Sequence, residues 1–255
     1  MSVDTTARAA LRVGQRTQSR YARVDALLAK SGIGLPTGSS LLGPTVAELL
    51  TPLPGSTSAV RECLAWRTHD PVEPDDSVRT ESVITRVAAD GDTAVVVRRV
   101  VLRDNVNALR EEAVETWQLR DGDIALTVPA TDFCTDRWGV LVRDSLSADP
   151  DFASSLATWD GTIGLRCDDR EIHLRVYRGR IIDVTRRAPG GATFTFIAPG
   201  HTWVDLILGE RNDFMRRAIT GEFSSAGDGY EYLRLTKPLD IVIAHARAIA
   251  QEAHP

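Results

Sequence analysis

The sequence predicts an α+β protein built from two units of similar size. In the N-terminal half, apolar residues first follow helical spacing and then, after Pro54-Gly55, alternate with a period of two. In the C-terminal half the same segment types occur in the opposite order, with strands before helices. The chain has 255 residues, 43% of them hydrophobic, which is enough for two cores of common domain size.

The N-terminal half is expected to hold two short helices followed by an antiparallel meander. Residues 1–10 are small and polar and are expected to fray. Apolar spacing predicts helices over 24–29 and 44–50, the second beginning at Pro44. Strict alternation predicts strands on both sides of a hairpin turn at 89–92. The expected strands cover 63–68, 78–87, 93–102 and 108–119.

The C-terminal half is expected to begin after an irregular segment. Residues 129–155 are rich in Asp, Ser and Pro and show little periodicity, which predicts a linker or strap between units at 11–128 and 156–253. Tight turns are expected at 168–169 and 178–179. The expected strands cover 162–167, 171–177, 180–186 and 192–197, and the expected helices 199–208, 213–219 and 240–251, the last after Pro238.

Composition excludes several classes of protein. The net charge of −5 is spread along the chain and aromatic residues make up 6%, so the basic footprint of a nucleic-acid-binding protein is missing. Cys63, Cys134 and Cys167 have neither disulfide-framework nor metal-ligand spacing, so we expect no bound metal or cofactor and a reducing, cytoplasmic location. Residues 1–12 lack a signal-peptide pattern, and no segment reaches the ~18 apolar residues that span a bilayer. We expect a soluble protein without membrane insertion.

Three stretches of the N-terminal half resemble one family. The family is the MaoC-like, R-specific enoyl-CoA hydratases. Leu11–Gln15 resembles the opening strand of these proteins, and Pro71–Val78 resembles their turn that leads into later strands. Residues 31–40 resemble a loop of the same family. This resemblance implies a hot-dog fold over 11–128, in which an antiparallel sheet surrounds a central helix. It also implies pairing through this unit, as a homodimer or a heterodimer.

The loop at 31–40 departs from the family where the chemistry is done. In the family an Asp and a His of this loop activate the water that adds to an enoyl thioester, which requires an acid/base pair. Ser31, Gly32 and Pro36 match the family loop. The positions of the family's polar side chains hold Ile33, Leu35, Gly38 and Ser40. Because neither Ile nor Gly can move a proton, we expect a chain that is not an autonomous enoyl-CoA hydratase.

Other catalytic candidates are few. The candidates are His69, Asp70 and Ser40. Because adjacent residues on a strand point to opposite faces, His69 and Asp70 are not expected to act as a dyad. The glutamates Glu111, Glu112 and Glu115 are expected to form a solvated strand face. Asp132, Cys134 and Asp136 offer no base that would activate the thiol.

The C-terminal half resembles the sterol carrier protein 2-like (SCP2-like) family over residues 159–252. The resemblance rests on Gly161–Leu165, the hairpin Val176–Val184, Trp203–Glu210, and Phe214–Phe223 followed by Gly227-Asp228. It implies a lipid-binding α+β fold, a sheet covered by helices, with an apolar tunnel. The expected ligand contacts are Phe194, Phe196, Trp203, Leu206, Phe214, Met215 and Tyr232.

Together these features predict binding of an apolar acyl, sterol or polyketide-type ligand by a hydratase-like scaffold without the Asp/His pair. Two alternatives stay open. The chain is a lyase or cyclase that orients a polyketide or acyl chain in a cavity, or it is a non-catalytic hot-dog subunit that pairs with an active hydratase. The expected partner is an apolar small molecule or an acyl thioester.

Overall fold

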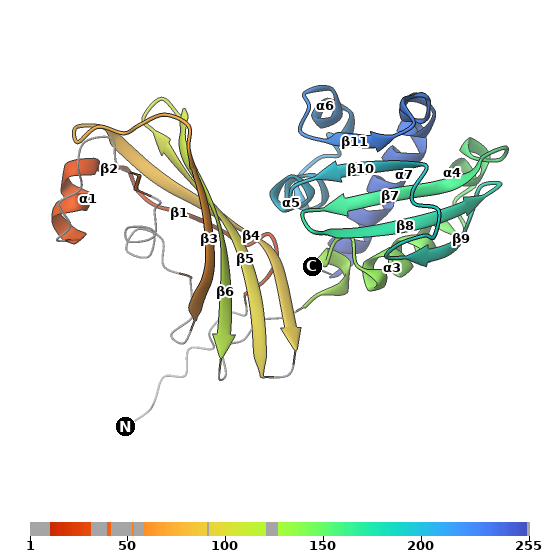
Figure 1. Cartoon of the computed structure of the whole chain (residues 1–255), viewed down its shortest axis with the longest axis horizontal. Coiled ribbons are helices and arrows are strands. Elements are labelled where there is room, and N and C mark those ends of the chain that lie inside the picture. Colours follow the sequence, from red (N-terminus) through yellow and green to blue (C-terminus); the bar gives the residue numbers. More distant parts are fainter. Residues whose placement is uncertain are drawn as a thin grey trace. The chain divides into compact units, whose positions relative to one another are not determined.

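The computed structural model of the chain describes residues 11–31, 40–41, 53, 59–90, 92–120 and 127–253. The chain divides into two compact units, an N-terminal unit of residues 1–127 and a C-terminal unit of residues 128–255 (Figure 1). Each unit combines an antiparallel or mixed sheet with helices, which confirms the α+β class.

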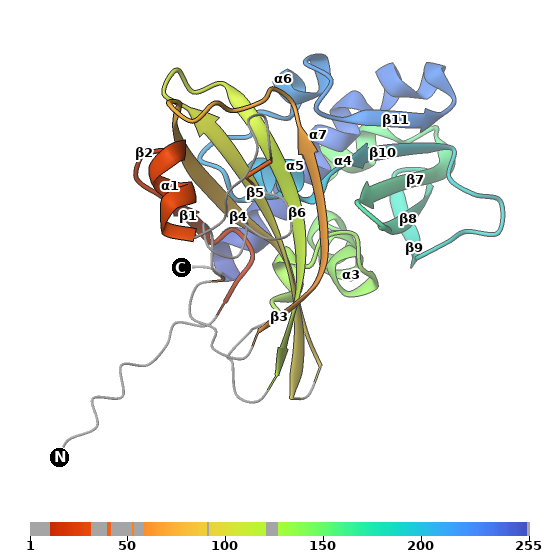
Figure 2. The same cartoon turned by 60° about the vertical axis from the view of Figure 1, so that its left-hand side comes forward.

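The N-terminal unit is a curved antiparallel sheet with one described helix. Its strands follow the order β1-β4-β5-β6-β3, with β2 paired to β4; Figure 2 shows β3 lying along β6 at one edge. The elements are β1 (Arg16–Gln18), β2 (Ala22–Arg23), α1 (Val24–Ser31), β3 (Val60–Thr68), β4 (Ser77–Asp90), β5 (Thr93–Asp104) and β6 (Leu109–Arg120). The helix predicted at 24–29 and the four predicted strands are confirmed. The helix predicted at 44–50 lies outside the described residues.

One face of this sheet forms the core of the unit. Because strand side chains alternate, Val100 on β5 and its register partner Ala113 on β6 point to the same side. Both are buried, in a cluster that also includes Val24 of α1. The same face carries Arg98 opposite Glu115, so a buried charged pair lies beside the apolar cluster.

The C-terminal unit is a five-stranded sheet with helices packed against it. The strand order is β11-β10-β7-β8-β9, and β10 and β7 form the parallel pair. The elements are η1 (Pro129–Thr131), α3 (Asp136–Leu146), α4 (Pro150–Ser155), β7 (Asp160–Cys167), β8 (Arg170–Tyr177), β9 (Arg180–Thr185), β10 (Phe194–Ala198), α5 (Gly200–Leu208), α6 (Phe214–Ile219), β11 (Ser224–Gly227) and α7 (Gly229–Ala253). Helix α3 packs against β8 and β9, and α7 packs against α3, α4 and α5.

The segment 129–155 is not the expected linker. It forms η1, α3 and α4, which belong to the C-terminal unit. Trp138, Val142 and Leu146 are buried at a spacing of four, which gives α3 an apolar stripe. The Thr135 hydroxyl accepts a hydrogen bond from the Trp138 N–H and so caps the start of the helix. The stripe is short and interrupted by charged residues, so it gives only a weak helix signal in the sequence.

The last helix also differs from the expectation. It was expected at 240–251 after Pro238, but α7 begins at Gly229 and contains Pro238 in its interior. Leu235, Pro238 and Leu239 are buried on one side of this extension. Their burial against the rest of the unit offsets the backbone hydrogen bond that proline cannot donate.

Candidate functional site

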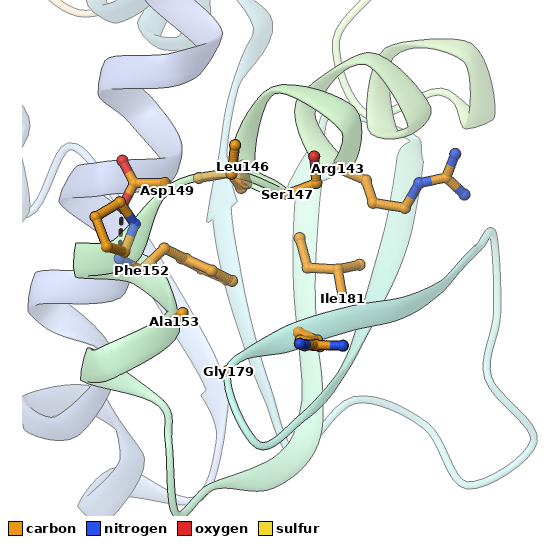
Figure 3. A pocket seen from close by; sticks show the side chains of 11 residues that line it. Arg143, Leu146, Ser147, Asp149, Phe152, Ala153, Gly179 and Ile181 are labelled. Carbon is orange, nitrogen blue, oxygen red and sulfur yellow. Dashed lines mark hydrogen bonds between the residues drawn. The ribbon is translucent and has the colours of Figure 1, made fainter.

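The C-terminal unit contains a cavity of about 560 Å³ between the end of α3, the start of α4 and the turn from β8 to β9 (Figure 3). This volume lies within the range of small-molecule sites, roughly 300–1,000 Å³. The lining residues are Arg143, Leu146, Ser147, Ala148, Asp149, Pro150, Phe152, Ala153, Gly179, Arg180 and Ile181.

The cavity wall is mainly apolar. Leu146 and Phe152 are buried, and Ile181 on β9 is half-buried. In Figure 3 the Ile181 side chain lies across the cavity from Phe152. Leu146 and Phe152 are only 3% and 1% exposed, so they form the base behind the wall. The lining residues with accessible apolar side chains are Ala148, Pro150, Ala153 and Ile181.

The position of β9 at the cavity depends on one glycine. Arg178 and Gly179 form the turn between β8 and β9, with φ of 49° and 78°. A Cβ at position 179 would overlap the carbonyl oxygen of Ala153 on α4. Only glycine combines the left-handed backbone with this close approach. The turn is therefore seated on α4, and this seating places Arg180 and Ile181 at the cavity.

Asp149 is held in the cavity wall by two hydrogen bonds. Its Oδ1 accepts from the Phe152 N–H at 2.7 Å and caps α4, and its Oδ2 contacts Nε2 of His245 at 2.8 Å. Nδ1 of His245 in turn contacts the Ser145 hydroxyl at 2.7 Å. The Phe152 N–H, followed by His245, lowers the pKa of Asp149. This row of three side chains ties α3, α4 and α7 together.

The row has the residue types of a Ser-His-Asp triad, but its geometry favours a structural role. A nucleophilic serine must face the substrate. Ser145 does not line the cavity. Arg143 and Ser147, which lie two positions before and after it, both do. Residues two apart on a helix do not share a face, so the Ser145 hydroxyl points away from the cavity. We assign the row to positioning Asp149.

The N-terminal unit contains a buried ion pair. Glu115 Oε2 accepts hydrogen bonds from Arg98 Nε at 2.9 Å and from Trp117 Nε1 at 3.0 Å, and Arg61 Nη1 lies 3.3 Å from Oε1. The side chains of Arg98 and Glu115 are at most 1% exposed. Burial lowers the pKa of Arg98, and the charge of Glu115 opposes this shift. The charge of Glu115 thus offsets part of the cost of burying the Arg98 guanidinium.

A second buried carboxylate belongs to Glu111. It accepts hydrogen bonds from the Ser40 hydroxyl at 2.7 Å and from the Leu41 N–H at 2.9 Å. The expectation of a solvated glutamate face is therefore wrong for Glu111 and Glu115, which are fully buried, and only Glu112 is partly exposed. Glutamates occupy both faces of β6, so alternation alone does not reveal which face is the core.

The remaining catalytic candidates have separate partners. His69 Nε2 lies 3.1 Å from Glu112 Oε1, and Asp70 Oδ2 lies 3.1 Å from Arg110 Nη1. His69 and Asp70 lie beyond β3, which ends at Thr68, so strand alternation does not decide their orientation; each has its own partner. Ser40 bonds to Glu111, as described above. Ile33, Leu35 and Gly38 lie outside the described residues, and the loss of hydratase chemistry at 31–40 stays a prediction.

The seven predicted ligand contacts lie away from the lining of the cavity. Five of them, Phe194, Phe196, Trp203, Leu206 and Phe214, are buried. Met215 is 44% exposed, and the ring of half-buried Tyr232 lies 6.1 Å from that of Phe194. The buried rings pack on one another, with Phe196 stacked on Phe223 at 4.3 Å. Their role as ligand contacts stays a prediction.

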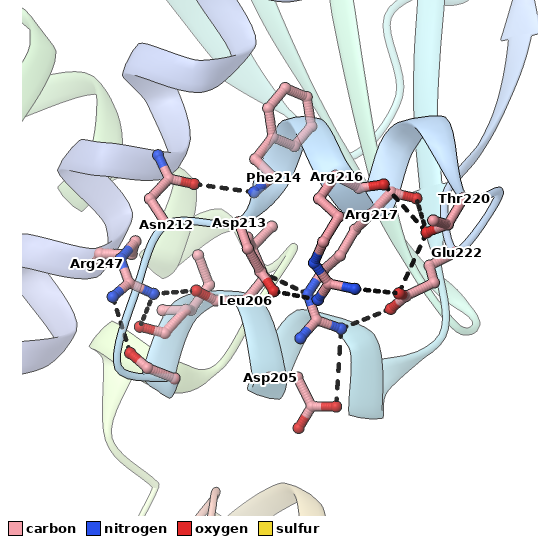
Figure 4. Close-up of polar contacts among 12 residues, drawn as sticks. Asp205, Leu206, Asn212, Asp213, Phe214, Arg216, Arg217, Thr220, Glu222 and Arg247 are labelled. Atoms are coloured by element: carbon pink, nitrogen blue, oxygen red, sulfur yellow. Dashed lines mark hydrogen bonds and ion pairs between the residues drawn. The ribbon is translucent and has the colours of Figure 1, made fainter.

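Polar contacts fix the helices that carry several of these residues (Figure 4). Arg217 on α6 donates to Asp213 at 2.6 Å and contacts Glu222 at 2.5 Å. Arg247 of α7 is buried and donates to the Gly209 carbonyl oxygen at 2.8 Å and to that of Leu206. It thereby satisfies carbonyl groups that the end of α5 leaves without helical partners.

The three cysteines differ in accessibility. Cys63 is exposed, whereas Cys134 and Cys167 are buried. Burial raises the pKa of Cys134 and raises that of Cys167 to about 12. Both thiols therefore stay protonated and unreactive near neutral pH.

Titration with a thiol reagent is expected to label one cysteine in the native protein and three after denaturation. Because the unfolded chain releases these thiol protons at a lower pH than the folded chain, stability should fall as pH rises above about 9. Rapid native labelling of two or three thiols would contradict the burial of Cys134 and Cys167.

Two kinds of feature are absent from the described residues. No group of three or more His, Cys, Asp or Glu side chains there is placed to hold a metal ion. None of the described helices is both long and apolar enough to cross a membrane.

Comparison with solved structures finds both resemblances that the sequence indicates. The chain is similar to sterol carrier protein 2, with 15% identity and a TM-score of 0.40, over 45% of this chain and 97% of that one. It is similar to a MaoC-like dehydratase from Rhodospirillum rubrum, with 18% identity and a TM-score of 0.34, over 44% and 94%. It is also similar to the (R)-hydratase from A. caviae, with 19% identity and a TM-score of 0.31, over 44% and 98%. No family model matches the sequence, and no curated protein matches it.

Sequence reasoning missed the residues of the cavity. They come from α3, α4 and the β8–β9 turn, and the first two elements lie in the segment expected to be a linker. One signal was available: Asp149-Pro150 is a capping residue followed by a proline at the first helical position, which is typical of a helix start.

Proposed function

We propose that this protein binds an apolar small molecule of acyl, sterol or polyketide type in the cavity of its C-terminal unit. The observation that carries this proposal is a cavity of about 560 Å³ with the accessible apolar side chains of Ala148, Pro150, Ala153 and Ile181 in its wall. Burying apolar ligand surface against such a wall stabilises a complex by roughly 25 cal/mol per Å² before the costs of association.

The N-terminal unit supports a binding role over hydration of enoyl thioesters. In the part of this unit that the structure describes, the buried carboxylates serve structural contacts, Glu115 with Arg98 and Glu111 with Ser40 and Leu41. A general base needs a lone pair directed at a substrate proton. We propose that this unit is a hydratase-like scaffold without the family's acid/base pair.

Replacing Ile181 with Asp tests the site. The substitution places a carboxylate in the apolar wall, so binding of lauryl alcohol to the full chain should weaken at least about tenfold. The measurement is a titration followed by native mass spectrometry or calorimetry.

The matched control is Ile182→Asp. Ile182 is the next residue on β9, is 59% exposed and does not line the cavity. It should leave the affinity for lauryl alcohol unchanged. Equal weakening in both variants, or no binding by the unaltered protein, would contradict the proposal.

A further inference from the structure

The cavity has a charged end as well as an apolar wall. Arg180 is the first residue of β9, lines the cavity and is exposed. The Gly179 turn, seated on α4, fixes the backbone from which this side chain extends. Among the described residues, no carboxylate forms an ion pair with Arg180, so its charge is open to a ligand.

The acidic groups near Arg180 have other partners. Asp149, the acidic residue of the lining, uses its two oxygens for the Phe152 N–H and for His245. Asp183, two residues along β9, is not a lining residue, and its carboxylate accepts a hydrogen bond from the Val184 N–H. Neither carboxylate neutralises Arg180.

The second arginine of the lining has a different role. Arg143 donates to the carboxylate of its neighbour Asp144 from Nε and Nη2, at 2.9 and 2.7 Å. In Figure 3 its guanidinium points away from Phe152 and Asp149. Arg180 is therefore the cation best placed to meet a ligand that enters the cavity.

We infer that Arg180 makes the cavity selective for amphiphiles with an anionic head group, a carboxylate or a phosphate, over neutral ones. This inference rests on the proposed function, because the apolar chain would lie against the wall that includes Ala153 and Ile181. Guanidinium groups form charge-assisted, often bidentate hydrogen bonds with both kinds of head group. A neutral sterol or alcohol would leave these donors to water.

The test compares three probes with the same apolar chain: lauryl alcohol, laurate and lauryl phosphate. The full-length protein should bind the two anions about tenfold more tightly than the alcohol, and the difference should shrink at high salt. A preference for either anion supports the inference, and the tighter one identifies the head group. Equal affinity for all three probes would overturn the inference but leave the proposed function intact, whereas binding of none of them would overturn both.

Substitutions in the turn assign the selectivity to one side chain. Arg180→Gln should remove the preference for anions, so that laurate and lauryl phosphate bind no more tightly to this variant than lauryl alcohol does, and Arg180→Lys should retain most of the preference. The matched control is Arg178→Gln, because Arg178 is exposed in the same turn, lies over the Tyr177 ring at 5.3 Å and does not line the cavity. Loss of the preference in Arg178→Gln, or its persistence in Arg180→Gln, would overturn the inference.

Discussion

Replacing Glu115 with Leu is expected to lower the free energy of unfolding by about 3–5 kcal/mol, a large share of the roughly 5–15 kcal/mol of a typical domain. The substitution leaves Arg98, which is 1% exposed, without the carboxylate that accepts two of its hydrogen bonds. It also removes the acceptor for Trp117 Nε1. Chemical denaturation of the full chain, followed by circular dichroism, measures the loss.

Two further variants separate charge burial from simple truncation. Glu112→Leu changes a neighbouring glutamate that is 25% exposed and should cost about 1 kcal/mol or less. The double change Arg98→Met with Glu115→Leu removes the two charges of the buried pair but also takes Glu115 from Arg61, so it should recover part of the stability. A cost for Glu115→Leu no larger than that for Glu112→Leu would contradict the buried ion pair.

Replacing Trp203 with Ala is expected to cost about 3–5 kcal/mol in the C-terminal unit. Trp203 is fully buried, and its ring centroid lies 6.0 Å from that of Trp138 and 6.4 Å from that of Phe196. Its Nε1 donates to the Arg166 carbonyl oxygen at 2.9 Å. Truncation would leave a cavity among aromatic rings and an unsatisfied carbonyl. The change in unfolding midpoint under thermal or chemical denaturation measures it.

Tyr230→Ala is the control for this prediction. Tyr230 is 92% exposed at the start of α7, so its removal should change stability by no more than about 0.5 kcal/mol. If Trp203→Ala were equally mild, Trp203 would not belong to the packed core. In that case its predicted role as a ligand contact would gain support.

The strands were predictable because each carries a local signal. Val95 to Leu102 alternates between the two faces of β5, and turn residues such as Asp168 and Gly179 mark the hairpins of the C-terminal sheet. The alternation does not tell which face is the core when charged residues lie on both. Glu111 and Glu115 were misread for this reason, since their burial depends on partners far away in the sequence.

The site was much less predictable than the fold. Aromatic residues at helical spacing suggested ligand contacts, but Phe196 and Trp203 pack on each other, as in any core. The cavity instead joins residues such as Leu146 and Ile181, which are 35 positions apart in the numbering and meet only once α3 packs on β9. Such a juxtaposition has no signature in a single sequence.

The most direct test of the proposed site is to locate a bound apolar chain by nuclear Overhauser effects in the full-length, methyl-labelled protein. With lauryl alcohol, we predict contacts between the alkyl chain and the methyl groups of Ile181 and Leu146, which line the cavity. Contacts to the buried Leu206 methyl groups without any to Ile181 would place the ligand in the aromatic layer and contradict the account. So would the absence of contacts to any methyl group of the C-terminal unit.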